Sequence, residues 1–142
     1  MKKFIAIIAG LAICAAAHAQ YSLQTTTLNG GTNNVAASTT NSVTAPVIAA
    51  TRASDVALQA TFKLTGSGTS AVVFVFDESI DNSNWESASR TLSVTAAGTS
   101  TVSNVGNYTL GGAGYLRLSS VQNPNSAAIT NLVLKYSLKP GI

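Results

Sequence analysis

From residue 54 onward, apolar and polar side chains alternate, and this alternation most limits what the chain can fold into. Within 54–64 every second residue is apolar, in the order Val56, Leu58, Ala60, Phe62 and Leu64. A period of two is typical of a β-strand with one buried and one exposed face. The alternation returns over 92–96, 115–121 and 132–138, and no stretch of ten residues after the N-terminal segment has a helical period. The sequence therefore predicts an all-β protein.

The predicted strands are spaced roughly 8–12 residues apart, and several of them are separated by clear turn-forming residues. These turn residues are Gly66-Ser67-Gly68, Gly98, the run 111–114 and Asn123-Pro124-Asn125. Residues 71–76 (AVVFVF) are apolar on both faces, which predicts a central strand that is covered on both sides. Seven or eight strands, by a rough count, fit a single antiparallel β-sandwich over 54–142, of jelly-roll or immunoglobulin-like kind.

Residues 20–53 are rich in Ser, Thr, Asn and Ala and contain few large apolar side chains. A turn is predicted at Asn29-Gly30-Gly31 and a break at Pro46, with short strands over 21–28 and 43–48. This segment is interpreted either as edge strands or as an N-terminal arm that orders on assembly.

Residues 1–19 have the three parts of a bacterial secretory signal, which would form a cleaved N-terminal signal helix. Lys2 and Lys3 are basic, residues 4–17 are apolar, and Ala17-His18-Ala19 is a small-x-small cleavage site. An uncleaved membrane anchor is the alternative, but a spanning helix needs about 20 apolar residues and this run is shorter. We therefore expect cleavage after Ala19 and a secreted, periplasmic or surface-associated protein, with no membrane segment in the mature form.

Cleavage would remove the only His and the only Cys, His18 and Cys14. A mature chain without imidazole or thiol excludes Ser–His and Cys–His catalysis, zinc sites of the usual kind and disulfides. The eight basic residues include Lys2 and Lys3, so six remain against five acidic ones, and they are scattered singly. Nucleic acid is therefore disfavoured as a partner, because phosphate binding needs clustered Lys and Arg. The Gly-rich run 111–114 lacks the Lys of a phosphate-binding loop, and no cofactor is predicted.

Residues 77–86 form the densest polar cluster, with four of the five acidic residues and the only Trp. Carboxylate and amide oxygens are the ligands that calcium prefers, but the spacing does not match the helix–loop–helix calcium pattern. A second interpretation pairs Asp77 with Asp81, with Glu86 nearby, as the carboxylates of a glycoside hydrolase. The favoured interpretation is a turn at 81–84, held by side-chain-to-backbone hydrogen bonds, with Trp85 packed over it. It predicts no catalytic and no metal-binding residue.

The segment Ser79-Ile80-Asp81-Asn82-Ser83-Asn84-Trp85 resembles the Ser-x-Asp-Gly-x-x-Trp hairpin of small structural β-sandwich proteins of tailed bacteriophages. The order of strands over 54–140 is similar to that family as well. Discoidin-type binding modules carry a similar turn but are longer and have further aromatic landmarks. Asn82 stands where the family has Gly, which Asn can replace because it tolerates positive φ. The resemblance implies a structural role in a virion, although a signal peptide is unusual there and an exported bacterial surface protein remains open.

These observations predict an exported, non-enzymatic structural or assembly protein at a cell or virion surface. Its expected partners are proteins or further copies of itself. The alternative is a secreted carbohydrate-binding module, with Trp85 as the stacking platform and a polysaccharide as partner. In either case the candidate contact residues are Trp85, Asp81, Asn84, Tyr115 and Arg117. Tyr115 and Arg117 share a strand face, where Arg117 is expected to lie along Tyr115.

Overall fold

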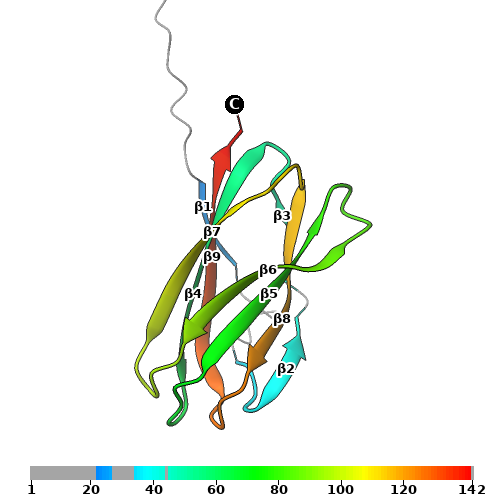
Figure 1. Cartoon of the computed structure of the whole chain (residues 1–142). Helices are drawn as coiled ribbons and strands as arrows, with labels where there is room; N and C mark the ends of the chain where they lie inside the picture. Colours follow the sequence, from blue (N-terminus) through cyan, green and yellow to red (C-terminus); the bar gives the residue numbers. More distant parts are fainter. Residues whose placement is uncertain (1–21, 27–33, 44, 142) are drawn as a thin grey trace, which may run out of the picture.

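The computed structural model describes residues 22–26, 34–43 and 45–141, and the predicted signal peptide lies outside these residues. The described chain contains strands and no helix (Figure 1). The strands are β1 (Ser22–Thr26), β2 (Thr39–Ser42), β3 (Ile48–Ala49), β4 (Ala53–Leu64), β5 (Ala71–Ser79), β6 (Glu86–Thr95), β7 (Val102–Thr109), β8 (Tyr115–Asn123) and β9 (Ile129–Pro140).

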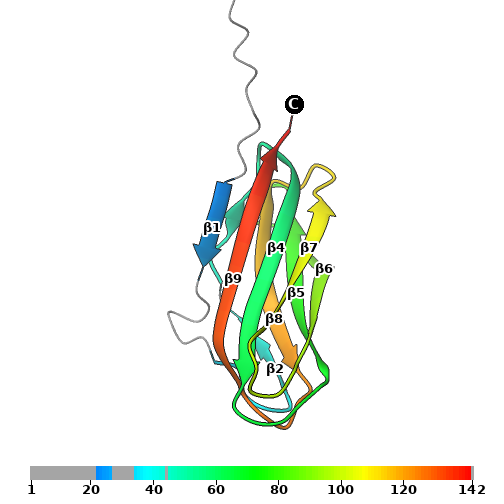
Figure 2. The same cartoon turned by 90° about the vertical axis from the view of Figure 1, so that its left-hand side faces the viewer.

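Two antiparallel sheets face each other. Sheet I has the order β1-β9-β4-β7, and sheet II has the order β2-β8-β5-β6, with β3 also paired to β8. β2 and β3 pair with successive parts of β8, so together they act as one interrupted edge strand. Counted in this way, the eight strands have the two-sheet order of a jelly roll, which confirms the predicted β-sandwich. Figure 2 looks onto sheet I, with sheet II behind it.

The core lies between the two sheets and is built from the alternating apolar residues. Every second side chain of β4, from Val56 to Leu64, is buried, as the alternation predicts. Phe62 of sheet I meets Phe74 of sheet II, with ring centroids 6.2 Å apart. Because such side chains are removed from water on both sheets, their burial is the main force that holds the sandwich together.

The strand expected over 43–48 is not formed as predicted. Pairing with β8 occupies Thr39–Ser42 and resumes only at Ile48 and Ala49. Val43 and Ile48 are buried beneath the interruption, which contains Pro46. Proline lacks the N–H that a continuous ladder would need, so the edge strand is split there. The structure places β1, β2 and β3 at sheet edges.

Two β-bulges disturb sheet II around Phe76. Toward β8 the pairing steps from Val75↔Ser120 to Phe76↔Leu118, and toward β6 it steps across Asp77. The bulge on β6 contains Ala88, whose φ is 54°. Bulges bend a strand and redirect its side chains, so this end of β5 is turned away from regular sheet geometry.

Side chains close one flank of the sandwich, where the edge strands β6 and β7 lie beside each other. Three donors reach edge carbonyls across this flank: Tyr108 Oη to Thr91 O (2.7 Å), Asn104 Nδ2 to Ser93 O (2.8 Å) and Arg90 Nη2 to Thr109 O (3.1 Å). We call this set the β6–β7 seam. Carbonyls occupied in this way cannot pair with a strand from another chain, which protects the two edges.

Two buried asparagines join the loops at the opposite end of the sandwich from the β5–β6 hairpin. The Asn125 side chain exchanges two hydrogen bonds with the backbone of Ser70, at 3.0 and 3.1 Å. Its Nδ2 also donates to Asn123 Oδ1, and Asn123 Nδ2 donates to the carbonyls of Ala36 and Ala127. Every polar atom of the two side chains is therefore satisfied, as burial requires.

Candidate functional site

The hairpin between β5 and β6 is held by the side chain of Asp81. Asp81 Oδ1 accepts hydrogen bonds from the N–H groups of Ser83 (2.9 Å) and Asn84 (2.8 Å), and Oδ2 accepts from Asn84 Nδ2 (2.8 Å). Ser79 Oγ donates to Asp81 Oδ1 and accepts from the N–H of Asn82. The prediction of a turn stabilised by side-chain-to-backbone hydrogen bonds is confirmed. Asn82 has a φ of 62°, a positive value that Asn tolerates.

These bonds also fix the charge of Asp81. The N–H groups of Asn84 and Ser83 hold the pKa of the Asp81 carboxyl well below its ordinary value, with the Asn84 and Ser79 side chains adding to the effect. A carboxylate that stays ionised and is surrounded by donors of its own turn is a poor proton donor. Asp81 and Asn84 thus stabilise the hairpin and are exposed at its surface.

Asp77 lies directly beneath the hairpin, on the outer face of β5. Its Oδ1 accepts from the N–H of Ala88 in the β6 bulge (3.0 Å), and its Oδ2 accepts from Arg117 Nε and Nη2 (3.2 and 3.1 Å). Burial raises the pKa of Asp77, but the bonds from Ala88, Ser119 and Arg117 outweigh it, so the pKa lies below its ordinary value. The bulge and the ion pair therefore depend on one ionised carboxylate.

Arg117 connects this carboxylate to Trp85. Its guanidinium carbon lies 4.1 Å from the centroid of the Trp85 ring, within cation–π distance. Trp85 is half-buried, so it packs on the hairpin without entering the core. The predicted stack of Arg117 on Tyr115 is wrong, because Asp77, opposite Arg117 in the sheet, draws the guanidinium toward the hairpin. Tyr115 shares the outer face of β8 with Arg117, as predicted, and is opposite Ser79.

The other two carboxylates of 77–86, those of Glu78 and Glu86, lie outside the Asp77–Arg117 pair and the Asp81 turn. Glu78 is buried and forms an ion pair with Arg90 (3.1 Å) at the end of the sandwich. Glu86 is exposed, opposite Glu78 in the ladder. Asp77 and Asp81 bond to separate sets of donors, so the structure does not join the carboxylates proposed for glycoside hydrolysis into one acid–base pair.

A hollow of about 450 Å³ adjoins this cluster at the end of the sandwich. Its wall includes Glu78, Ile80, Glu86, Arg90 and the glycines Gly111 and Gly112. Ile80 is 81% exposed, so the second large apolar residue of the hairpin is not packed against Trp85. The hairpin loop thus combines an exposed apolar side chain at its start with a polar turn at 81–84.

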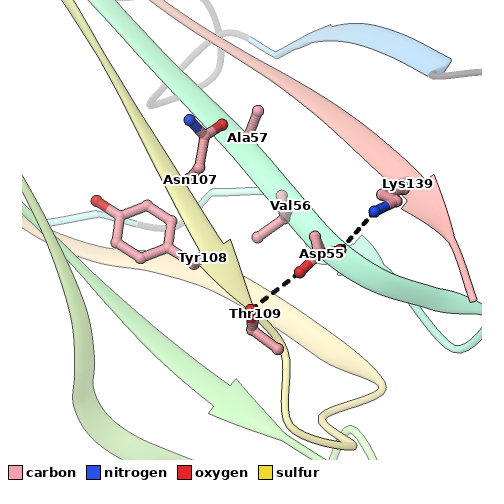
Figure 3. Close-up of a pocket in the computed structure, with 7 residues that line it drawn as sticks. All are labelled: Asp55, Val56, Ala57, Asn107, Tyr108, Thr109 and Lys139. Atoms are coloured by element: carbon pink, nitrogen blue, oxygen red, sulfur yellow. Dashed lines mark hydrogen bonds and ion pairs between the residues drawn. The ribbon is translucent and has the colours of Figure 1, made fainter.

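A second hollow, of about 260 Å³, lies on sheet I between β4 and β7 (Figure 3). Asp55 stands between Thr109 and Lys139, accepting a hydrogen bond from Thr109 Oγ1 (2.9 Å) and pairing with Lys139 Nζ (3.6 Å). Hydrogen bonds from Ser54 and Thr109 lower the pKa of Asp55. This hollow was not predicted from the sequence, although the outward positions of 54–64 in the alternating pattern contain some of its residues.

No group of three or more His, Cys, Asp or Glu side chains in the described ranges is placed to hold a metal ion. Among those same residues, no helix is long and apolar enough to cross a membrane.

Comparison with known proteins gives a structural match and no sequence match. No family model matches the chain, and no curated protein matches it. Among solved structures, the crystal structure of murine APRIL at pH 8.5 is similar, with a TM-score of 0.50 and 10% sequence identity. The match covers 84% of this chain and 99% of that one. At this identity the likeness concerns the fold alone, and it agrees with the jelly-roll order of the strands.

Proposed function

We propose that this chain is an exported, non-enzymatic structural protein that acts by assembling at a cell or virion surface. The observation that carries the proposal is that the charged side chains around the hairpin are bonded within the fold. Asp77, Glu78 and Asp81 each bond to groups of the chain's own fold. These carboxylates hold the projecting hairpin in place, which supports a role for the hairpin in binding another molecule. An acid–base catalyst would instead need a carboxyl group that is free to exchange protons.

Export rests on the N-terminal pattern. Residues 1–19 have the basic start, apolar run and cleavage site of a secretory signal. The exported protein should therefore begin at Gln20, with the mass of that chain or of its pyroglutamate form. Recovery of the chain from Met1, retained in membranes, would overturn the export part of the proposal.

Assembly is tested by the mass of the exported protein in solution. Sedimentation velocity over a concentration series should show oligomers or filaments that grow with concentration. A strictly monomeric protein that is retained on a polysaccharide column would instead support the carbohydrate-binding alternative. In that case Trp85, whose ring is half-buried and already carries Arg117, would be the residue to test for stacking on sugar.

A further inference from the structure

The loop of the β5–β6 hairpin carries the most exposed large apolar side chain in the described chain. Ile80 is 81% exposed, against 50% for Val105 and 42% for Val47. The turn beside it is fixed by the bonds of Ser79 and Asp81. An apolar side chain on a turn that is already ordered loses little conformational entropy on binding, which favours its use as a contact.

The outer face of sheet I has a complementary shape. Ala57, Asn107 and Ser137 are opposite one another across β7, β4 and β9, and they form a row of short side chains. Hollows of about 260 and 190 Å³ meet at Ala57, one toward Lys139 and the other toward Val105 and Lys135. We call the two hollows and the row between them the sheet I trough. Val105 gives it an exposed apolar wall.

The two surfaces also carry opposite charge. At the hairpin, Asp77 and Glu78 are neutralised by Arg117 and Arg90, which leaves the exposed Asp81 and Glu86. On the outer face of sheet I, Lys139 pairs with the single carboxylate, Asp55, which leaves Lys63 and Lys135. Complementary charge of this kind orients two surfaces and speeds their encounter.

A hairpin cannot reach the trough of its own molecule. Figure 1 shows the β5–β6 hairpin projecting from sheet II, away from sheet I, and Figure 2 looks onto the outer face of sheet I, where the residues of the trough lie. The partner must therefore be a different molecule, and the contact joins two unlike surfaces. Contacts of this kind leave a free hairpin and a free trough at the ends, so they continue into rings or filaments.

We propose that the hairpin loop of one copy, with Ile80 as its apolar anchor, docks in the sheet I trough of a second copy. This inference rests on the proposed assembly function and names the two surfaces that would produce it. Asp81 and Glu86 of one copy then face Lys135 of the next, which is unpaired among the described residues.

Substitutions at the two surfaces should each weaken self-association of the exported protein. Ile80→Ser removes the anchor, and Val105→Glu places a bulky carboxylate in the trough. Sedimentation velocity should show the association constant of either variant lowered roughly tenfold or more, since burial of a large apolar side chain is lost. Val47→Ser and Val47→Glu, at an exposed site outside both surfaces, are the matched controls and should associate as the unmodified protein does.

Mixing the two variants is the decisive measurement. A copy with Ile80→Ser keeps its trough and a copy with Val105→Glu keeps its hairpin, so an equimolar mixture should form dimers that cannot extend. A mixture that stays monomeric, or variants that assemble as well as the unmodified protein, would overturn the docking while leaving assembly itself intact. An unmodified protein that is monomeric at every concentration would overturn the proposed function, and the docking with it.

Discussion

The guanidinium carbon of Arg117 lies 4.1 Å from the centre of the Trp85 ring, so the group that neutralises a buried carboxylate also covers the only indole of the chain. This contact joins β8 to the β5–β6 hairpin through side chains alone. The position of Trp85 therefore depends on Asp77 and Arg117 as much as on its own turn.

Trp85→Ala should lower the free energy of unfolding by about 1–2 kcal/mol, because it removes a cation–π contact and a half-buried ring. A fully buried Trp would cost about 3–5 kcal/mol. Urea denaturation followed by circular dichroism measures the loss, and Trp85→Phe should recover part of it. In an Arg117→Met background the same change should cost less, so equal costs in the two backgrounds would show that the pair does not interact.

Stability should fall in acid because the pKa values of Asp77 and Asp81 are lowered in the native state. The unfolded chain then binds protons first, near the ordinary Asp value of about 3.9, and its protonation favours unfolding. The stabilisation is complete above that pH and is lost as the pH falls through the native pKa values. Asp77→Asn should flatten the dependence of the free energy of unfolding on pH in acid, as measured by denaturation curves recorded at several pH values. Glu86→Gln removes an exposed carboxylate of the same hairpin, and equal flattening by both variants would contradict a special role for Asp77.

Asn125→Ala should cost about 1–3 kcal/mol, because it leaves the backbone groups of Ser70 without their partners. Asn125→Asp should cost more, since a carboxylate cannot donate to Ser70 O or to Asn123 Oδ1 and its charge would be buried. Thermal denaturation compares these variants with Ser126→Ala, an exposed change in the same hairpin that should stay within about 0.5 kcal/mol. An Asn125→Asp protein as stable as the unmodified one would contradict the hydrogen-bond assignment.

Gly106→Ala should destabilise the protein by about 1–3 kcal/mol through overpacking. A Cβ at this position would collide with the Tyr108 ring, whose hydroxyl donates to Thr91 O in the β6–β7 seam. The sign is diagnostic, because replacing a strand Gly by Ala ordinarily stabilises by roughly 0.5–1 kcal/mol. In a Tyr108→Ala background, chemical denaturation should show that ordinary gain, and a loss in both backgrounds would point to a different cause.

The long strands could be predicted from the sequence because their apolar residues alternate. The pattern of Val56 to Leu64 alone identifies β4 and its buried face. β2 was missed because Thr39–Ser42 has no large apolar residue, and its strand conformation depends on pairing with β8. Sequence patterns describe one strand at a time, so an edge strand defined by its neighbour leaves little local signal.

The hydrogen bonds within the hairpin turn could be predicted from the sequence, but its contacts with other strands could not. The bonds of Asp81 to Ser83 and Asn84 join neighbours in sequence, and residue type and spacing suffice to expect them. The partner of Arg117 could not be inferred, since it depends on the bulges that bring Asp77 and Ala88 together. The sheet I trough was missed for the same reason, because its row of short side chains exists only once β4, β7 and β9 are in register.

β9 lies between β1 and β4 in sheet I, although it is the last of the described strands along the chain. A nascent chain that lacks residues 129–140 has no partner for β1 and only one for β4, so sheet I cannot be completed before β9 is made. Pairing of β9 with β4 also joins residues far apart in sequence, which makes folding slow. The strand order therefore ties completion of sheet I, and with it the closing of the core, to the last strand that is made.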